Sequence, residues 1–221
     1  FIYAAVEQKG LFQLNKKGDV LKHFDKTNST LQTNQIFDIN KIGADIGLCT
    51  EKYFYKLNHS NQINQIKIGK DSNKFSYILN CNTDEQGLIY LSTNHGIAIL
   101  DQQGNTQQLI YSNSNSAILG KTIVSSVVPT KGNIVISTLD NGIFILKNNQ
   151  VIRHYYRNKG LPNNVVYNMG ITTDGDIWAC TNAGIARCMQ GDDQFVPISV
   201  SDGLPASYYS FGSMQCFDHF V

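Results

Sequence analysis

The chain has 221 residues, with 18 Lys and Arg against 17 Asp and Glu, so its formal net charge is +1. This balance offers no basic surface to a polyanion and excludes a dedicated nucleic-acid or polybasic membrane binder. The hydrophobic fraction of 42% supplies a core, and no run reaches the roughly 20 apolar residues of a transmembrane helix. Residues 1–15 lack a signal-peptide pattern and residues 1–6 read as a strand, so we expect that a preceding segment was removed.

An internal repeat is the most informative feature of the sequence. Residues 84–97, 131–143 and 174–185 align as a turn, an apolar strand, a polar turn closing on glycine, and a second apolar strand. Residues 2–14 and 46–57 repeat this pattern more weakly, the latter with tyrosine in place of the glycine. The five anchors lie 43, 43, 46 and 42 residues apart, at Gly10, Tyr53, Gly96, Gly142 and Gly184.

A period in the low forties with four strand signals per unit predicts β-propeller blades. The apolar runs are four to six residues long, rich in β-branched and aromatic residues, and without helical spacing. We therefore predict an all-β chain of five repeats of about 43 residues, each with strands A (innermost), B, C and D. Strand A is expected at residues 34–40, 75–81, 122–128, 165–171 and 207–214, and one unit continues with B at 176–181, C at 185–189 and D at 194–199.

Small residues mark the turns and strand ends of this repeat. Glycine is expected to take positive φ in the A-to-B turns, at Gly87, Gly132 and Gly175. A threonine ends each strand B, where its hydroxyl can bond a neighbouring backbone group, at Thr50, Thr93, Thr138 and Thr181. We assign these residues structural roles.

The two ends of the chain allow two forms of the propeller. Residues 1–221 form a single propeller domain or a fragment of one, and residues 201–221 begin the next blade or close the ring. In the closed form, which we favour, residues 207–214 supply strand A to the blade begun at Phe1, because closure satisfies exposed strand edges. The rival is an arc of a larger, seven-bladed propeller.

Cysteine and histidine spacing gives no metal or disulfide framework. The cysteines are odd in number and lack CxxC spacing, which favours buried free thiols at Cys49, Cys81, Cys180, Cys188 and Cys216. Cys49 and Cys180 occupy the same blade position three blades apart, and Cys180 with Cys188 is the only close pair expected. The five histidines are never at i, i+2 or i+4 spacing, so we predict neither a metal nor a cofactor.

One stretch resembles a known repeat in detail. It runs Gly160-Leu161-Pro162-Asn163-Asn164-Val165, followed by Asp174-Gly175-Asp176-Ile177-Trp178-Ala179-Cys180-Thr181-Asn182-Ala183-Gly184-Ile185. This stretch resembles the two-component regulator propeller repeat, G-L-P-x-N-x-V followed by D-x-x-G-x-[IL]-W-[IV]-G-T-x-x-G-[IL]. The similarity is strong over residues 158–189, moderate over 74–146 and weak over 1–60. The chain departs from the pattern at the residue before the strand-ending threonine, which is Cys49, Ser92, Ser137 or Cys180 instead of glycine.

The resemblance implies a function and a location. Such repeats are typical of periplasmic sensor regions in hybrid two-component histidine kinases of gut Bacteroidetes, where polysaccharide fragments are the usual signal, and they also occur in other envelope proteins. It implies the sensor region of a dimeric inner-membrane protein whose signal peptide, membrane segment and kinase are not in this chain. A second propeller and an immunoglobulin-like domain of the same protein are the implied partners, besides an oligosaccharide or other small-molecule signal.

Catalysis is not indicated. Five-bladed glycoside hydrolases need two carboxyl groups about 5 to 10 Å apart on inner strands, and among the predicted inner strands only Asp38 is acidic. The sequence contains no HExxH, GxSxG, Walker A or GxGxxG motif. We therefore expect no catalytic residue and no enzyme activity in this domain.

A ligand is expected where the D-to-A and B-to-C loops ring one mouth of the propeller. Neutral amides and aromatics at these loops suit sugar hydroxyls, although asparagine also makes tight turns. The predicted ligand-binding residues are Lys52, His95, Asp140, Asn141 and Asn182 from B-to-C turns, with Asn34, Asn164 and Tyr208 from the starts of strands A. A rigid protein-interaction propeller and, last, a glycoside hydrolase are the alternatives to an oligosaccharide sensor.

Overall fold

The computed structural model describes residues 1–68, 75–111, 122–206 and 209. These residues form 19 strands in five sheets, in which consecutive strands are hydrogen-bonded neighbours. The chain divides into two compact units. Unit 1 comprises residues 1–94 and 98–109, and unit 2 comprises residues 95–97 and 110–221.

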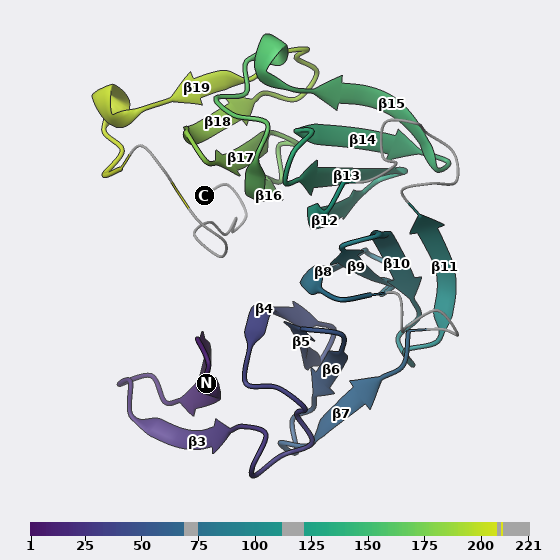
Figure 1. Cartoon of the computed structure of the whole chain (residues 1–221), viewed down its shortest axis with the longest axis vertical. Helices are drawn as coiled ribbons and strands as arrows, with labels where there is room; N and C mark the ends of the chain where they lie inside the picture. The colour runs from purple at the N-terminus through teal and green to yellow at the C-terminus, as the bar shows by residue number, and fades with distance from the viewer. Residues whose placement is uncertain (69–74, 112–121, 207–208, 210–221) are drawn as a thin grey trace. The chain divides into compact units, whose positions relative to one another are not determined.

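Unit 1 contains a three-stranded sheet followed by two four-stranded sheets (Figure 1). The first is β1 (Ile2–Val6), β2 (Gly10–Leu14) and β3 (Val20–Phe24), which correspond to strands B, C and D. The second is β4 (Ile36–Ile42), β5 (Asp45–Thr50), β6 (Phe54–Leu57) and β7 (Ile63–Ile66). The third is β8 (Ile78–Thr83), β9 (Ile89–Thr93), β10 (Gly96–Leu100) and β11 (Thr106–Tyr111), of which residues 95–97 and 110–111 group with unit 2.

Unit 2 contains the other two four-stranded sheets (Figure 1). One is β12 (Val124–Thr130), β13 (Asn133–Thr138), β14 (Ile143–Lys147) and β15 (Gln150–Tyr155). The other is β16 (Val166–Ile171), β17 (Ile177–Thr181), β18 (Gly184–Cys188) and β19 (Val196–Ile198). Two 3-10 turns, η2 (Arg157–Lys159) and η3 (Val200–Asp202), are the helical elements of the described chain. In each unit, first strands of neighbouring sheets contact each other, β4 with β8 and β12 with β16.

The predicted strand pattern is confirmed over the described residues. The four described strands A begin one to three residues later than expected, because the preceding residues belong to the connecting loop. Asn34 Oδ1 accepts a hydrogen bond from Lys26 N at 2.8 Å, and Asn164 Oδ1 accepts one from Arg157 N at 2.8 Å. The fifth, at 207–214, lies outside the described residues, except Tyr209.

The predicted turn chemistry is confirmed as well. Glycines of the A-to-B turns have φ of 81°, 81° and 88°, at Gly87, Gly132 and Gly175. Thr138 Oγ1 donates to Gly142 O at 2.9 Å, and Thr181 Oγ1 donates to Gly184 O at 2.7 Å. In the turn where Tyr53 replaces glycine, Lys52 takes the positive φ, at 64°.

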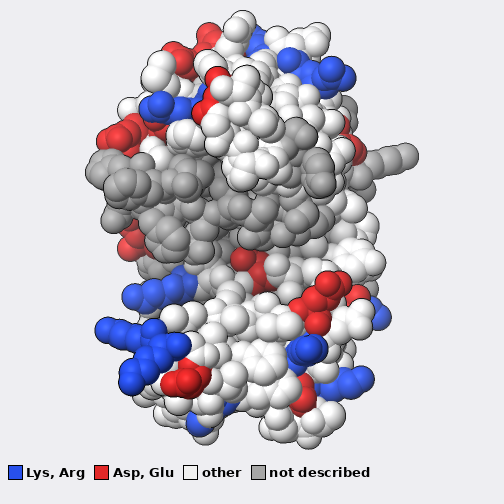
Figure 2. Space-filling model, turned by 90° about the vertical axis from the view of Figure 1, so that its left-hand side faces the viewer, with Lys and Arg blue, Asp and Glu red and all other residues white. Residues whose placement is uncertain are grey.

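Apolar residues between neighbouring sheets form the core of each unit. In unit 1, Leu11 and Phe24 pack with Leu31 and Leu48. In unit 2, Leu161 of the Gly-Leu-Pro motif is 3% exposed and packs among residues of both sheets. On the face drawn in Figure 2, charged side chains of both signs are interspersed among uncharged ones, as the composition predicts.

Candidate functional site

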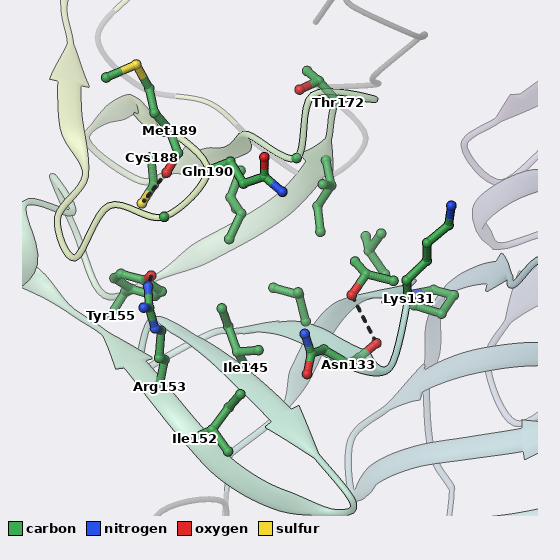
Figure 3. A pocket seen from close by; sticks show the side chains of 18 of the residues that line it. Lys131, Asn133, Ile145, Ile152, Arg153, Tyr155, Thr172, Cys188, Met189 and Gln190 are labelled. Carbon is green, nitrogen blue, oxygen red and sulfur yellow. Dashed lines mark hydrogen bonds between the residues drawn. The ribbon is translucent and has the colours of Figure 1, made fainter.

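A pocket of about 700 Å³ lies between the two sheets of unit 2 (Figure 3). It is bordered by the A-to-B turns of both sheets, by strand β15, and by the turn from β18 to β19. Its volume falls in the range of roughly 300 to 1,000 Å³ typical of small-molecule sites. This concavity is therefore bordered by the A-to-B turns, and not by the B-to-C and D-to-A loops that were predicted to bind a ligand.

The floor of the pocket is apolar. Val128 and Val135 come from the sheet β12–β15, and Ile171 and Ile177 come from the sheet β16–β19. Ile145 of β14 is half-buried and packs against the same core cluster. This floor gives a bound molecule an apolar surface to cover.

The rim of the pocket carries polar groups of several kinds. They include the amides of Asn133 and Gln190, the hydroxyl of Thr172, and the cations of Lys131 and Arg153. Figure 3 shows Gln190 extending into the pocket from the β18–β19 turn, on the side opposite Asn133 and Ile145. Donors and acceptors thus approach the same space from both sheets.

Hydrogen bonds between the two sheets hold the pocket walls together. Arg153 Nη1 and Tyr155 Oη of β15 donate to Asp192 O at 3.1 Å and 3.0 Å. Phe195 N donates to Lys159 O at 2.8 Å. The following Gly160 has φ of 88°, and a Cβ built on it would lie 1.9 Å from Phe195 O. The loop after β15 is therefore pressed against the backbone that enters β19.

Asp176 positions the turn that carries Gln190. Its carboxylate accepts Gln190 N at 2.9 Å and two donors of Arg187, at 2.6 Å and 3.0 Å. The Arg187 guanidinium, with the Gln190 N–H, holds the pKa of Asp176 below its usual range. Asp176 belongs to the A-to-B turn of the repeat motif. The sequence did not indicate that its carboxylate contacts Arg187 and Gln190.

In unit 1, the two predicted ligand-binding residues lie at the same end of their strands. Asn34 precedes β4 and uses its side-chain oxygen to hold the loop at Lys26. Lys52 is exposed in the turn between β5 and β6. The strands β4 and β5 pair from Ile36 with Thr50, so both residues flank the same end of the sheet.

In unit 2, backbone contacts bring three predicted loops together. Gly142 N donates to Asn164 O at 2.9 Å, and Asn182 N donates to Val165 O at 3.1 Å. Asn141 O is within 2.7 Å of His154 Nε2, and Asp140 Oδ1 accepts the Thr122 hydroxyl. Tyr167 Oη donates to Asn182 Oδ1 at 3.3 Å. Most of the predicted loop residues therefore make hydrogen bonds that stabilise the loops themselves.

The predicted loop face and the pocket lie at opposite ends of the strands. His95 is exposed in the turn between β9 and β10, and Tyr208 lies outside the described residues. None of the seven described candidates lines the pocket. Sequence reasoning missed the pocket because its lining is spread over turns, strand ends and a D strand that no single motif contains.

A second cluster of reactive groups lies in unit 1. Asp38 of β4, Cys49 of β5 and Cys81 of β8 place a carboxylate oxygen and two sulfurs within 4.8 Å of one another. A bulge in strand A places Asp38 opposite Cys49 in the β4–β5 pair. Asp38 Oδ2 accepts Asn80 Nδ2 and Cys81 N, both at 3.1 Å.

Burial controls the protonation of this cluster. Both thiols are fully buried, and burial raises the pKa of Cys49 well above its ordinary value. Burial also raises the pKa of Asp38 to about 6, against the opposing effect of hydrogen bonds from Cys81 and Asn80. No described basic side chain contributes to the Asp38 pKa. The cluster therefore holds a carboxyl group without a cationic partner among the described residues.

The cysteine predictions are confirmed in part and wrong in part. Four cysteines are buried free thiols as expected, and Cys216 lies outside the described residues. The expectation that Cys180 and Cys188 form the close pair is wrong. Cys180 is opposite Ile185 and Cys188 is opposite Ile177, so the two lie several rungs apart on the hairpin. The close pair, Cys49 and Cys81, joins different sheets, which spacing within one repeat cannot indicate.

Comparison with known proteins places the fold. No protein-family model and no curated protein matches the sequence. The extracellular domain of BT4673 from B. thetaiotaomicron, described as a hybrid two component system, is similar with 19% identity and a TM-score of 0.64. The match covers 81% of this chain and 25% of that one, so the chain spans about a quarter of the length of that extracellular domain.

Two further structures share the fold. PorZ, a bacterial surface component of the type-IX secretion system of Porphyromonas gingivalis, matches with 16% identity and a TM-score of 0.63 over 88% of this chain and 26% of its own. Virginiamycin B lyase from Staphylococcus aureus matches with 13% identity and a TM-score of 0.66 over 90% and 67%. The chain thus has an all-β, propeller-like fold, and its resemblance to two-component propellers is confirmed at the level of the fold.

Proposed function

We propose that this chain is a ligand-sensing propeller of a bacterial envelope two-component signalling protein, and that it recognises an oligosaccharide. The Gly-Leu-Pro repeat and the fold shared with the extracellular domain of BT4673 support the signalling context. The observation that carries the proposal is the pocket of unit 2, which has an apolar floor and a rim of amides, hydroxyls and cations.

The pocket chemistry suits a sugar. The axial hydrogens of a pyranose can cover apolar side chains such as Ile145, while its hydroxyls bond the amides of Asn133 and Gln190. Lys131 and Arg153 at the rim add affinity for an oligosaccharide that carries a carboxylate or sulfate. The tie between Arg153 and Asp192 keeps this cation in place before a ligand arrives.

The loop face remains a second proposed location for the same ligand. Among the predicted residues, Lys52, His95, Asp140 and Asn182 are exposed, and Asn34, Asn141 and Asn164 are half-buried. Tyr208 lies outside the described residues. We rank it second because Asn34 and Asn164 use their side chains to hold their own loops.

The setting of the chain follows from the same proposal. We propose that it lies in the periplasm as part of a dimeric inner-membrane protein with a second propeller, an immunoglobulin-like domain and a histidine kinase, without nucleic-acid partners. The BT4673 relative is an extracellular domain, and no described helix is long and apolar enough to cross a membrane. We also propose that residues 1–221 close into one five-bladed ring through residues 207–214. A crosslink between cysteines placed at Ile2 and Tyr209 tests this closure.

An enzyme is the weakest alternative for the domain. The lyase relative shows that this fold can carry an enzyme, but Asp38 lies beside two thiols instead of a second carboxyl group. A rigid protein-interaction propeller without a small ligand remains the other alternative.

Calorimetry against neutral and uronate-containing oligosaccharides tests the proposal. We expect micromolar to millimolar binding without turnover, weakened about tenfold or more by Gln190→Ala and by Asn133→Ala. Gln102→Ala is the matched control, because Gln102 covers Gly87 in unit 1 as Gln190 covers Gly175 in unit 2.

The other outcomes separate the alternatives. Binding lost in Asn182→Ala but kept in Gln190→Ala would move the site to the loop face. Absence of binding across the panel would favour the interaction propeller. Hydrolysis of any glycan would establish an enzyme, with Asp38 as the first residue to substitute.

A further inference from the structure

The cluster of Asp38, Cys49 and Cys81 in unit 1 is independent of the sensing pocket. Its three side chains come from the first two strands of one sheet and the first strand of the next. Cys49 and Cys81 are 0% exposed, whereas Asp38 is only partly buried. Asp38 is therefore the least buried of the three residues.

The spacing of the ligand atoms suits a small thiophilic cation. Zinc binds thiolate sulfur at about 2.3 Å and carboxylate oxygen at about 2.0 to 2.2 Å. Tetrahedral coordination at these lengths puts neighbouring ligand atoms roughly 3.4 to 3.8 Å apart. The oxygen and the two sulfurs already lie within 4.8 Å of one another, so small side-chain rotations bring them to bonding distance.

Surrounding groups orient these side chains as in a metal site. Asn80 Nδ2 and Cys81 N hold the Asp38 carboxylate. The Asn40 backbone N–H and the Cys49 thiol interact with the Cys81 sulfur. Such outer hydrogen bonds fix ligand orientation and tune affinity in metal proteins.

A glycine keeps space beside one of the sulfurs. A Cβ built on Gly47 of β5 would lie 2.9 Å from Cys81 Sγ and 3.1 Å from the Phe54 ring. Gly47 is not among the residues with positive φ, so its backbone does not require glycine. What requires it is the packing around Cys81.

We propose that Asp38, Cys49 and Cys81 bind one Zn²⁺ ion that bridges the sheets β4–β7 and β8–β11 of unit 1. Binding replaces the two thiol protons, which leave to solvent, and the ion supplies the positive charge that the Asp38 carboxylate lacks. Two soft sulfurs with one oxygen select zinc over magnesium or calcium. A solvent molecule completes the fourth position.

The test measures metal binding by the 221-residue chain prepared under reducing conditions. Atomic emission after dialysis against Zn²⁺ is expected to give one ion per chain, and Co²⁺ is expected to give thiolate charge-transfer and tetrahedral d–d bands. Cys81→Ser and Asp38→Asn should each lower the affinity by about 100-fold or more, and Asn80→Ala by about 10- to 100-fold. Cys180→Ser is the matched control, since Cys180 faces Asn168 on strand A as Cys49 faces Asp38.

A second measurement does not depend on the folding of the cysteine variants. In the unsubstituted chain, Zn²⁺ should slow alkylation of Cys49 and Cys81 but leave that of Cys180 unchanged, as read by peptide mass spectrometry. Equal stoichiometry in the unsubstituted and Asp38→Asn chains would overturn the proposal. So would equal protection of all three thiols, or a Cys49–Cys81 disulfide in protein purified without reductant.

Discussion

The same position of the repeat carries different chemistry in the two units. In the sheet β4–β7 of unit 1 the residue after the strand A bulge is Asp38, opposite Cys49, and in the sheet β12–β15 of unit 2 it is Ser126, opposite Ser137. Ser125, at the bulge itself, has its hydroxyl 2.9 Å from that of Ser137 and donates to Val166 O at 2.6 Å. Neutral hydroxyls thus satisfy one another in unit 2. The fold needs a polar residue at this position but not a carboxylate, so Asp38 is free to serve another purpose.

The junction between neighbouring sheets shows a second difference. Asn34 and Asn164 hold equivalent loops with the same hydrogen bond. The residue directly before the buried leucine of each loop, Leu31 or Leu161, differs between the units. Unit 1 has Thr30 there, whose hydroxyl donates to Ile63 O at 2.6 Å. Unit 2 uses Gly160, which lies against Phe195 O. One junction therefore depends on a side chain and the other on the lack of one.

The largest expected effect comes from Gly160→Ala, which breaks the unit 2 junction. The added Cβ would lie 1.9 Å from Phe195 O, at a φ of 88°. We expect the free energy of unfolding to fall by at least about 3 kcal/mol, measured by urea denaturation. Gly132→Ala is the control, because its φ of 81° is similar but no atom lies within 4 Å, and it should cost about 1 kcal/mol. Equal losses of stability in Gly160→Ala and Gly132→Ala would show that the backbone at Phe195 moves to accommodate the added Cβ.

Ser125→Ala tests the hydroxyl network of unit 2. It removes the donor to Val166 O from a buried site, so stability should fall by about 1 to 3 kcal/mol. Thermal unfolding measures the change. Ser201→Ala, at an exposed position, should stay within about 0.5 kcal/mol of the parent. An unchanged melting temperature for Ser125→Ala would mean that water replaces the hydroxyl.

The threonines that end strands B make the same hydrogen bond in both units. Thr50, Thr138 and Thr181 each donate to the carbonyl that closes the B-to-C turn, at 2.7 to 2.9 Å. Substitution of each by valine should lower the free energy of unfolding by about 1 kcal/mol, as measured by denaturant titration of the three variants side by side. A cost confined to one unit would contradict the equivalence of these turns.

The smallest effect concerns pH. Because Arg187 depresses the pKa of Asp176, the stability it contributes is complete above the ordinary carboxyl value of 3.8 and is lost as pH falls through the lower folded value. Asp176→Asn should therefore destabilise the chain at pH 7 but leave its stability at pH 2 close to that of the parent. Urea midpoints at the two pH values provide the measurement, and an equal gap at both would exclude this ion pair as the cause.

Features that lie within one repeat could be predicted from the sequence, whereas contacts between repeats could not. The period and its glycines placed the described strands to within three residues, because each hairpin is specified by its own turn. The bulge that sets Asp38 opposite Cys49 adds one residue to strand A, which an alignment of motifs does not register. The pairing of Cys49 with Cys81 and the pocket floor both form between sheets. Their positions depend on packing that a repeat pattern does not encode.

The carbonyl of Asp192 gives the pocket a mechanical property. Arg153 and Tyr155 reach it from the preceding sheet, so the two walls cannot separate without releasing both donors. A molecule too large for the resting pocket must break these bonds or be refused, whereas one that fits leaves them intact. Widening of the pocket therefore requires the two donors to leave Asp192 O together, so it is coupled to the angle between the two sheets of unit 2.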